Sequence, residues 1–148
     1  MGKRRRAREL VLQGLYAWEV SNNSVETILE DFRKIQENDD EVMAFTIGLL
    51  TKATQNREAL DEAVSQVVTN WQFERIALLD RLVLRMALCE LMNYEEIPPK
   101  VTINEAIDLA KKFSTYESGR FVNGVLDALY KKLKEDKRIT KSGRGLID

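Results

Sequence analysis

Hydrophobic residues recur at helical spacing along almost the whole chain, in segments separated by short polar breaks. The first segment predicts a helix over residues 4–20, with a stripe formed by Ala7, Val11, Gly14, Leu15 and Trp18. Three further stripes follow over residues 25–37, 42–53 and 54–68. Ser24 and Asp39 stand at the breaks, where their side-chain oxygens are suited to cap the helices that follow.

The second half of the chain begins with a segment, residues 76–94, that is apolar nearly all round the helix. This pattern is typical of a central, buried helix. Pro98 and Pro99 end it, because neither residue can continue a helix. Thr102 and Glu105 then form the Thr-x-x-Glu pattern of a capping box for the next helix.

Two connections remain. Trp71 and Phe73 lie before the buried helix, and we expect them to pin that connection to the core. Residues 114–119 form a polar break before the last helix, whose stripe consists of Phe121, Val122, Val125, Leu126, Leu129 and Leu133.

These elements predict an all-α fold of about seven helices, and the length fits one compact domain or two small helical subdomains that share an interface. For two subdomains, we expect an N-terminal one over residues 1–70 and a C-terminal one over residues 71–134, followed by a charged, flexible tail over residues 135–148. Two prolines and seven glycines are too few for a strand-and-turn architecture. No apolar run approaches the roughly 18 residues of a membrane span, so we expect a soluble, cytoplasmic protein.

Charge is strongly segregated, although the formal net charge is only −1. Acids dominate residues 19–41, bases dominate again from Lys131 onward, and five bases without an acid lie within the first eight residues: Lys3, Arg4, Arg5, Arg6 and Arg8. Bases are unfavourable at a helix N-terminus, so this arginine-rich arm indicates a polyanion partner, with a solvated terminus as the plain alternative. Arginine makes planar contacts with phosphates and bases, and the absence of a helix-turn-helix or zinc-finger pattern favours RNA over duplex DNA.

A second candidate RNA surface combines basic residues with aromatic rings: Lys111, Lys112, Phe113, Arg120 and Phe121. Positive charges suit an RNA backbone, and rings suit the stacking of unpaired bases. Phe113 and Phe121 also lie on apolar stripes, so a position in the core is the alternative for each ring.

Most catalytic chemistry is excluded by composition. The chain has no histidine and one cysteine, Cys89, which lies in an apolar stretch and is interpreted as a buried structural thiol. Ser-His-Asp and Cys-His catalysis and Cys/His zinc sites are therefore impossible. Carboxylate pairs stay formally open, but the acids lie mostly on polar helix faces. We expect no enzyme activity, no cofactor and no metal; a pure protein-interaction bundle whose arm contacts no RNA remains the other hypothesis.

Four stretches together resemble the NusB family of transcription antitermination factors, and they cover nearly the whole folded chain. They read RRRARELVLQGLYAWEV, WQFERIALLDRLVLRMALCEL, IPPKVTINEAIDLAKKFS and ESGRFVNGVLDAL. The resemblance implies the NusB-like antitermination fold and binding to the boxA sequence of ribosomal RNA leaders, as a heterodimer with NusE, a ribosomal small-subunit protein. It implies indirect association with other Nus factors and RNA polymerase, and it leaves a homodimer open as an inhibited form. NusB-like domains also occur fused to ribosomal RNA methyltransferases, but no Gly-rich loop after a strand is present here.

Carried over position by position, the resemblance assigns RNA binding to the arginine-rich arm and to Lys112, Phe113, Arg120 and Phe121. It assigns partner binding to Tyr16, Asp80 and Glu117, each of which has a plainer interpretation. Tyr16 could be a core residue, and Glu117 could be an ordinary surface acid. Asp80, an acid in an otherwise apolar helix, must reach solvent, a salt bridge or a partner.

Two small or polar residues of the last stretch are expected to have structural roles. The Asn123 amide would satisfy buried backbone groups, and Gly124 would allow a close approach of another helix.

Overall fold

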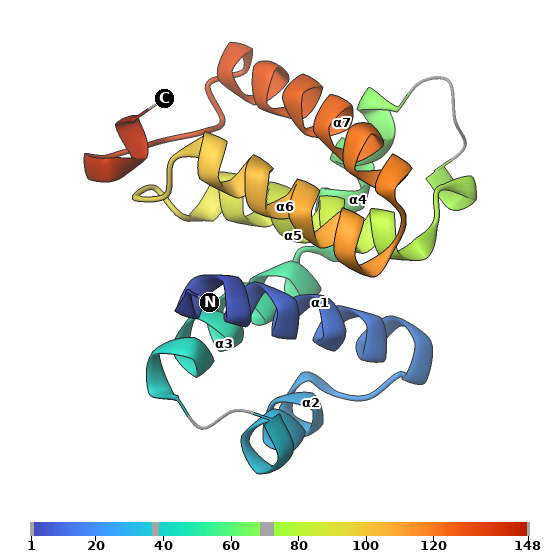
Figure 1. Ribbon diagram of the computed structural model, residues 1–148. Coiled ribbons are helices and arrows are strands. Elements are labelled where there is room, and N and C mark those ends of the chain that lie inside the picture. The colour runs from blue at the N-terminus through green and yellow to red at the C-terminus, as the bar shows by residue number, and fades with distance from the viewer. Residues whose placement is uncertain (1, 37–38, 69–72, 148) are drawn as a thin grey trace. The chain divides into compact units, whose positions relative to one another are not determined.

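The computed structural model describes residues 2–36, 39–68 and 73–147 of the 148-residue chain. These described residues form seven α-helices and no strand, which confirms the all-α prediction (Figure 1). The chain divides into two compact units, residues 1–56 and 57–148. The boundary thus lies before the fourth helix, whereas the sequence led us to expect it near residue 70.

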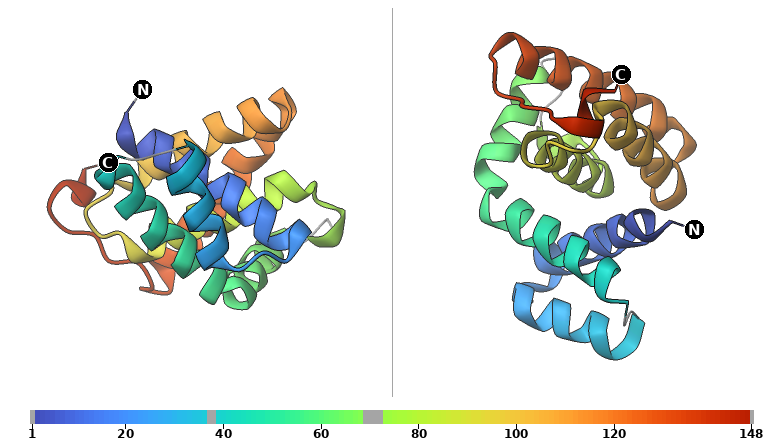
Figure 2. Two further views of the ribbon diagram at one scale, coloured as in Figure 1. Left: turned by 90° about the horizontal axis from the view of Figure 1, so that it is seen from below. Right: turned by 90° about the vertical axis from the view of Figure 1, so that its left-hand side faces the viewer.

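The N-terminal unit consists of α1 (Lys3–Ser21), α2 (Val25–Asp31), a π-helical turn η1 (Phe32–Gln36) and α3 (Asp40–Gln55). Helix α1 packs against both α2 and α3 (Figures 1 and 2). Gly14 allows this packing, because a Cβ atom at that position would lie 3.0 Å from Leu50 Cδ2 and 3.3 Å from Ile28 Cγ2. An alanine at this position would force the Leu50 or Ile28 side chain to shift by a few tenths of an ångström.

Two predicted helix caps in this unit are confirmed. Ser24 Oγ accepts a hydrogen bond of 3.1 Å from the Thr27 N–H at the start of α2. Asp39 Oδ1 accepts hydrogen bonds of 2.9 and 3.2 Å from the N–H groups of Glu41 and Val42 at the start of α3. These N–H groups have no partner within the helix, so the caps stabilise both helix starts.

The C-terminal unit consists of α4 (Arg57–Val67), η2 (Phe73–Arg75), α5 (Leu78–Asn93), α6 (Pro99–Phe113), α7 (Tyr116–Glu135) and η3 (Gly143–Leu146). Helix α5 is central, as its apolar pattern predicts, and packs against α4, α6 and α7 (Figure 1). Helix α4 belongs to this unit because it packs against α5 and α7, with Leu60 and Val64 buried. Phe73 is half-buried in η2, and Trp71 lies outside the described residues.

Two predicted helix starts are wrong. The capping box at Thr102 and Glu105 does not begin a helix, because α6 already begins at Pro99, where proline's missing N–H needs no partner. Thr102 is instead buried inside α6, and its hydroxyl donates to the Glu90 carboxylate of α5. The expected break over residues 114–119 is also shorter, since α7 begins at Tyr116.

The tail, expected to be flexible, is partly fixed on the turn between α5 and α6. The Ser142 N–H donates to the Glu95 carbonyl at 3.0 Å, and Lys141 Nζ donates to the Tyr94 carbonyl at 2.9 Å. Partial burial lowers the pKa of Lys141. Gly145 is buried so closely that a Cβ atom there would lie 1.8 Å from the Glu95 carbonyl oxygen. The tail can therefore pack against the Glu95 backbone only because residue 145 is a glycine.

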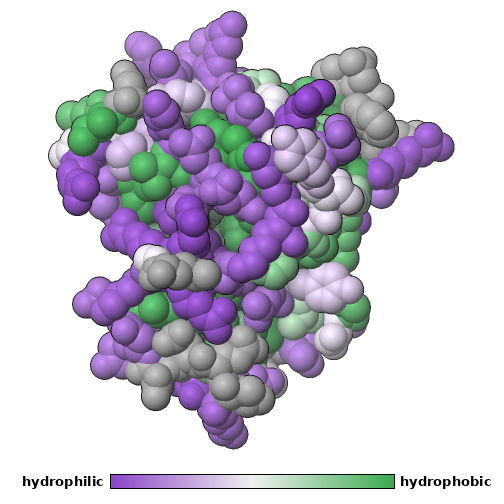
Figure 3. All heavy atoms as spheres, in the orientation of Figure 1, coloured by the Kyte–Doolittle hydropathy of each residue, from purple (hydrophilic) through white to green (hydrophobic). Residues whose placement is uncertain are grey.

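Hydrophilic residues predominate on the face shown in Figure 3, with hydrophobic residues in small patches between them. Amphipathic helices leave this kind of surface when their apolar stripes are buried. Of the described helices, none combines the length and the apolar character needed to cross a membrane.

Candidate RNA and partner interfaces

The five bases of the arginine-rich arm lie in the first two turns of α1. The helix begins at Lys3 without a side-chain cap and with no acid in its first turn. Lys3, Arg4 and Arg5 are exposed, Arg6 is half-buried, and Arg8 is only 4% exposed. The structure therefore separates exposed charges at the start of the arm from a buried guanidinium at Arg8.

Phe45 of α3 fixes two of these arginines. The guanidinium carbons of Arg4 and Arg8 lie 5.0 and 5.4 Å from the centroid of the Phe45 ring, within the range of a cation–π interaction. Arg4 and Arg8 are one helical turn apart, so both reach the same ring. Sequence reasoning missed Phe45, because its place on an apolar stripe made it look like an ordinary core residue.

Lys3 is held at the start of α3 by two acids. Its Nζ lies 3.3 Å from Asp39 Oδ2 and 3.4 Å from Glu41 Oε1. The hydrogen bond with Asp39 raises the pKa of Lys3, and the hydrogen bond from the Val42 N–H lowers the pKa of Asp39. Exposed ion pairs of this kind contribute little to stability, but they orient the first turn of the arm. An RNA phosphate would compete with these carboxylates for Lys3.

The second predicted RNA surface lies where α6 ends and α7 begins. Lys112 and Arg120 are exposed, whereas Phe113 and Phe121 are half-buried. Lys112 Nζ lies 5.3 Å from the centroid of the Phe113 ring. Each ring thus combines packing against the unit with some accessible surface, so neither ring is fully buried in the core.

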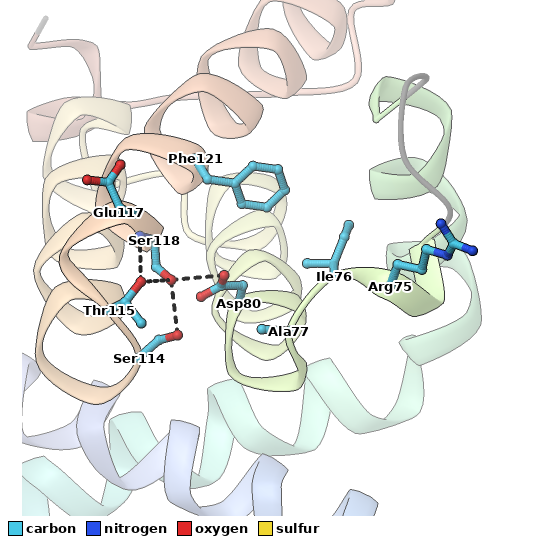
Figure 4. Close-up of a pocket in the computed structure, with 9 residues that line it drawn as sticks. All are labelled: Arg75, Ile76, Ala77, Asp80, Ser114, Thr115, Glu117, Ser118 and Phe121. Atoms are coloured by element: carbon cyan, nitrogen blue, oxygen red, sulfur yellow. Dashed lines mark hydrogen bonds between the residues drawn. The ribbon is translucent and has the colours of Figure 1, made fainter.

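A pocket of about 350 Å³ opens beside this surface (Figure 4). One wall comes from η2 and α5, and the other comes from the α6–α7 turn and the start of α7. Its lining residues are Arg75, Ile76, Ala77, Asp80, Ser114, Thr115, Glu117, Ser118 and Phe121. The pocket therefore brings together two of the predicted partner residues, Asp80 and Glu117, with one predicted RNA residue, Phe121.

Asp80 has an unusual hydrogen-bonding position in this pocket. It is 7% exposed, and its Oδ2 accepts a hydrogen bond of 3.0 Å from Ser118 Oγ. The Ser118 oxygen also lies 3.0 Å from the hydroxyl oxygens of Ser114 and Thr115 (Figure 4). A hydroxyl carries a single proton, and the carboxylate is the strongest acceptor available, so Ser118 donates to Asp80 and accepts from its neighbours.

The second carboxylate oxygen, Asp80 Oδ1, is buried and has no hydrogen-bond partner among the described residues. A buried charged oxygen without a donor is costly. The pocket thus contains an acceptor that would attract a hydrogen-bond donor from a bound molecule. The sequence indicated Asp80 through its place in an apolar helix, but it gave no sign of the bond from Ser118.

The remaining predicted residues lie as follows. Tyr16, on α1, is 45% exposed and therefore not a core residue. Glu117 is exposed, and its carboxylate points away from Asp80 (Figure 4). The structural roles expected for Asn123 and Gly124 are wrong, because Asn123 is exposed and a Cβ atom at Gly124 would meet no neighbour within 4 Å.

Cys89 is fully buried in α5, as its apolar surroundings predict. Within the described ranges, no group of three or more cysteine and acidic side chains could hold a metal ion.

The described residues define an all-helical protein of two units, with an arginine-rich first helix and a pocket that contains a buried acceptor. Residues 5–131 match the NusB family. The transcription antitermination protein NusB of Salinibacter ruber is 42% identical over 148 residues, which cover 99% of this chain and 92% of that protein. The chain belongs to the NusB family.

Solved structures agree with this assignment. NusB of T. maritima superposes with a TM-score of 0.80 at 33% identity, covering 89% of this chain and 92% of that one. A structure of the antitermination factors NusB and NusE in complex with dsRNA has a TM-score of 0.80 at 24% identity, covering 89% of this chain and 98% of that one. The second likeness extends to the fold alone.

Proposed function

We propose that this protein is a transcription antitermination factor that binds boxA-type single-stranded RNA of ribosomal RNA leaders together with NusE. In this role it helps RNA polymerase to avoid premature termination. Its relative in Salinibacter ruber is named a transcription antitermination protein. A protein of the same fold has been solved with NusE and dsRNA, which supports RNA and NusE as the two classes of partner.

The observation that carries this proposal is the ordered arginine-rich arm. Phe45 and the acids of α3 already hold Arg4, Arg8 and Lys3 in a helix. An arm that is ordered before binding loses little conformational entropy when RNA arrives, which favours affinity. Its exposed charges supply phosphate contacts, whereas the buried Arg8 acts by positioning the arm.

The surface at the α6–α7 turn supplies the base contacts in this proposal. Lys112 and Arg120 attract the backbone, and the accessible parts of Phe113 and Phe121 receive unpaired bases. Charges alone would attract any polyanion, so these rings are needed for a preference among RNA sequences.

NusE binds, in this proposal, through Tyr16, Asp80 and Glu117. The unsatisfied Asp80 Oδ1 accepts a hydrogen bond from a donor group of the partner, and the exposed Tyr16 ring offers a contact on the N-terminal unit. Other Nus factors and RNA polymerase then join the RNA–NusE complex indirectly, in the cytoplasm. A homodimer would be an inhibited form if it used the same residues; dimers that persist at saturating NusE would contradict that role.

The test is fluorescence anisotropy of a labelled boxA-like RNA at fixed salt. The protein is added alone and with NusE, and a scrambled RNA of the same length is the control. We expect selective binding to the boxA-like RNA that tightens when NusE is present. Equal binding to both RNAs would reduce the function to attraction between a basic arm and a polyanion. Absence of binding would favour a pure protein-interaction bundle.

A further inference from the structure

The side chain of Tyr116, the first residue of α7, lies mostly in solvent. It is 72% exposed, the largest exposure of any large hydrophobic residue among those described. An exposed aromatic ring offers a flat face of the kind on which an unpaired base stacks. None of the predicted RNA or partner sites includes Tyr116.

The ring is paired with a cation from the preceding helix. Lys111 Nζ of α6 lies 5.3 Å from the centroid of the Tyr116 ring. This is cation–π distance, and it places the ammonium over one face of the ring. Since the residue is 72% exposed, the opposite face cannot also be covered. One face of Tyr116 is therefore available to a flat ligand.

Gly119 makes this arrangement possible. A Cβ atom built at Gly119 would lie 2.8 Å from both Cγ and Cε of Lys111. The aliphatic stem of Lys111 thus lies directly over the glycine, one turn of α7 beyond Tyr116, and its ammonium reaches the ring from there. The three residues form one unit, the Tyr116 platform, which consists of Lys111, Tyr116 and Gly119.

The charges around the Tyr116 platform suit a nucleic acid. Lys111 and Lys112 precede Tyr116 by five and four residues, Arg120 follows it by four, and all three bases are exposed. Glu117, the acid next to Tyr116, weakens a purely electrostatic attraction. The ring adds a stacking contact that the charges cannot supply, because stacking depends on the flat face of a base and not on charge.

We propose that Tyr116 is a stacking platform for an unpaired RNA base, with Lys111 holding the neighbouring phosphate. This inference rests on the proposed RNA-binding function and extends its surface beyond Phe113 and Phe121. Those two rings are half-buried and offer only part of their surface, whereas the Tyr116 ring stands free of the core and can offer a whole face to a base.

The experiment uses the full chain and the labelled boxA-like RNA. Tyr116→Ala should weaken RNA binding about 5- to 150-fold, the range typical of one lost base–aromatic stack. Tyr116→Phe and Tyr116→Trp should bind almost as well as the native chain, because each keeps a ring. The slope of log affinity against log salt should not change in Tyr116→Ala, since no charge is removed.

Tyr130→Ala is the matched control. Tyr130 lies on the same helix and carries the same kind of pair, with Lys134 Nζ 5.0 Å from its ring centroid. We expect RNA affinity within about twofold of the native chain for this variant, because no base stack is lost. Thermal unfolding of all variants checks that Tyr116→Ala is folded, which its exposure predicts.

The outcomes are distinguishable. If the native chain binds boxA-like RNA and Tyr116→Ala binds equally well, the platform is refuted and the proposed function stands. If Tyr116→Ala weakens NusE binding and leaves RNA binding intact, Tyr116 is a protein contact and the platform is again refuted. If the native chain binds no RNA, the proposed function itself fails.

Discussion

Arg85 of α5 and Asp61 of α4 form a bidentate ion pair, in which two guanidinium nitrogens each contact a different carboxylate oxygen. Arg85 Nε lies 2.9 Å from Asp61 Oδ1, and Nη2 lies 2.9 Å from Oδ2. The arginine side chain is only 2% exposed and the carboxylate 17%. This pair joins α4 to the central helix, which explains why α4 belongs to the C-terminal unit.

Asp61→Ala should lower the free energy of unfolding by about 3 kcal/mol, because the Arg85 charge would remain buried without this partner. Chemical denaturation followed by circular dichroism measures the loss. Arg57→Ala is the control, since Arg57 is half exposed and its Nε lies 3.8 Å from the same carboxylate. That variant should lose less than about 1 kcal/mol. Equal losses in the two variants would show that burial of Arg85 is unimportant.

Gly145→Ala should release the tail, because its Cβ atom would collide with the Glu95 carbonyl. We expect the Ser142 amide to lose its protection from hydrogen exchange and trypsin to cut faster after Lys141 and Arg144. Gly124→Ala is the control, because Gly124 lies exposed in α7 and a Cβ atom there would meet no neighbour within 4 Å. It should raise stability by about 0.5–1 kcal/mol. An unchanged exchange rate at Ser142 in Gly145→Ala would mean that the tail does not depend on this contact.

Replacing Arg4, Arg5 and Arg6 together by alanine should flatten the salt dependence of RNA binding. Each phosphate contact to single-stranded RNA contributes about −0.7 to the log–log slope, so the loss of three should flatten the slope by about 2. Titrations at several salt concentrations measure this slope. The matched control replaces Lys131, Lys132 and Lys134, three exposed bases near the end of α7, and should leave the slope unchanged. If only the control variant flattened the salt slope, the RNA site would lie at the end of α7 and not at the arm.

Acid should loosen the start of α3 through Asp39. The pKa of Asp39 is lowered in the folded chain, so the folded state binds fewer protons than the unfolded state near that pKa. The stabilisation is therefore complete above the ordinary aspartate pKa of 3.8 and is lost as the pH falls through the lower folded value. Asn caps a helix as well as Asp and does not titrate. Asp39→Asn should thus lose less stability than the native chain between pH 5 and pH 3 in urea denaturation, and a larger loss would contradict this assignment.

Asp80→Asn should weaken NusE binding about 10- to 100-fold, the range for a hydrogen bond to a charged group. The amide replaces one carboxylate oxygen by a donor and removes the charge, so the partner's donor would lose its acceptor. Isothermal titration with NusE measures the affinity. Ser114→Ala serves as a control in the same pocket, because it leaves the Ser118–Asp80 bond in place. A fall in NusE affinity for the control but not for Asp80→Asn would show that Asp80 is not the acceptor that NusE uses.

Helical periodicity and local caps were enough to predict the all-α fold. A repeat of 3.6 residues fixes which face of each helix is buried, and Ser24 and Asp39 cap helices from within three residues. The start of α6 was missed because Pro98 and Pro99 were interpreted only as the end of a helix, although proline also suits the first turn of one.

The sequence by itself determined the all-helical class of the fold, the segregated charge of the arm and the absence of histidine and disulfide chemistry, because these depend on composition and on neighbours along the chain. Only the tertiary structure decided which helix faces pack against each other. It placed Phe45 under Arg4 and Arg8, Ser118 beside Asp80, and Gly145 against Glu95. The physical reason is that periodicity specifies that a face is buried but not what buries it. Contacts between residues 37 to 50 positions apart are fixed only when the helices pack.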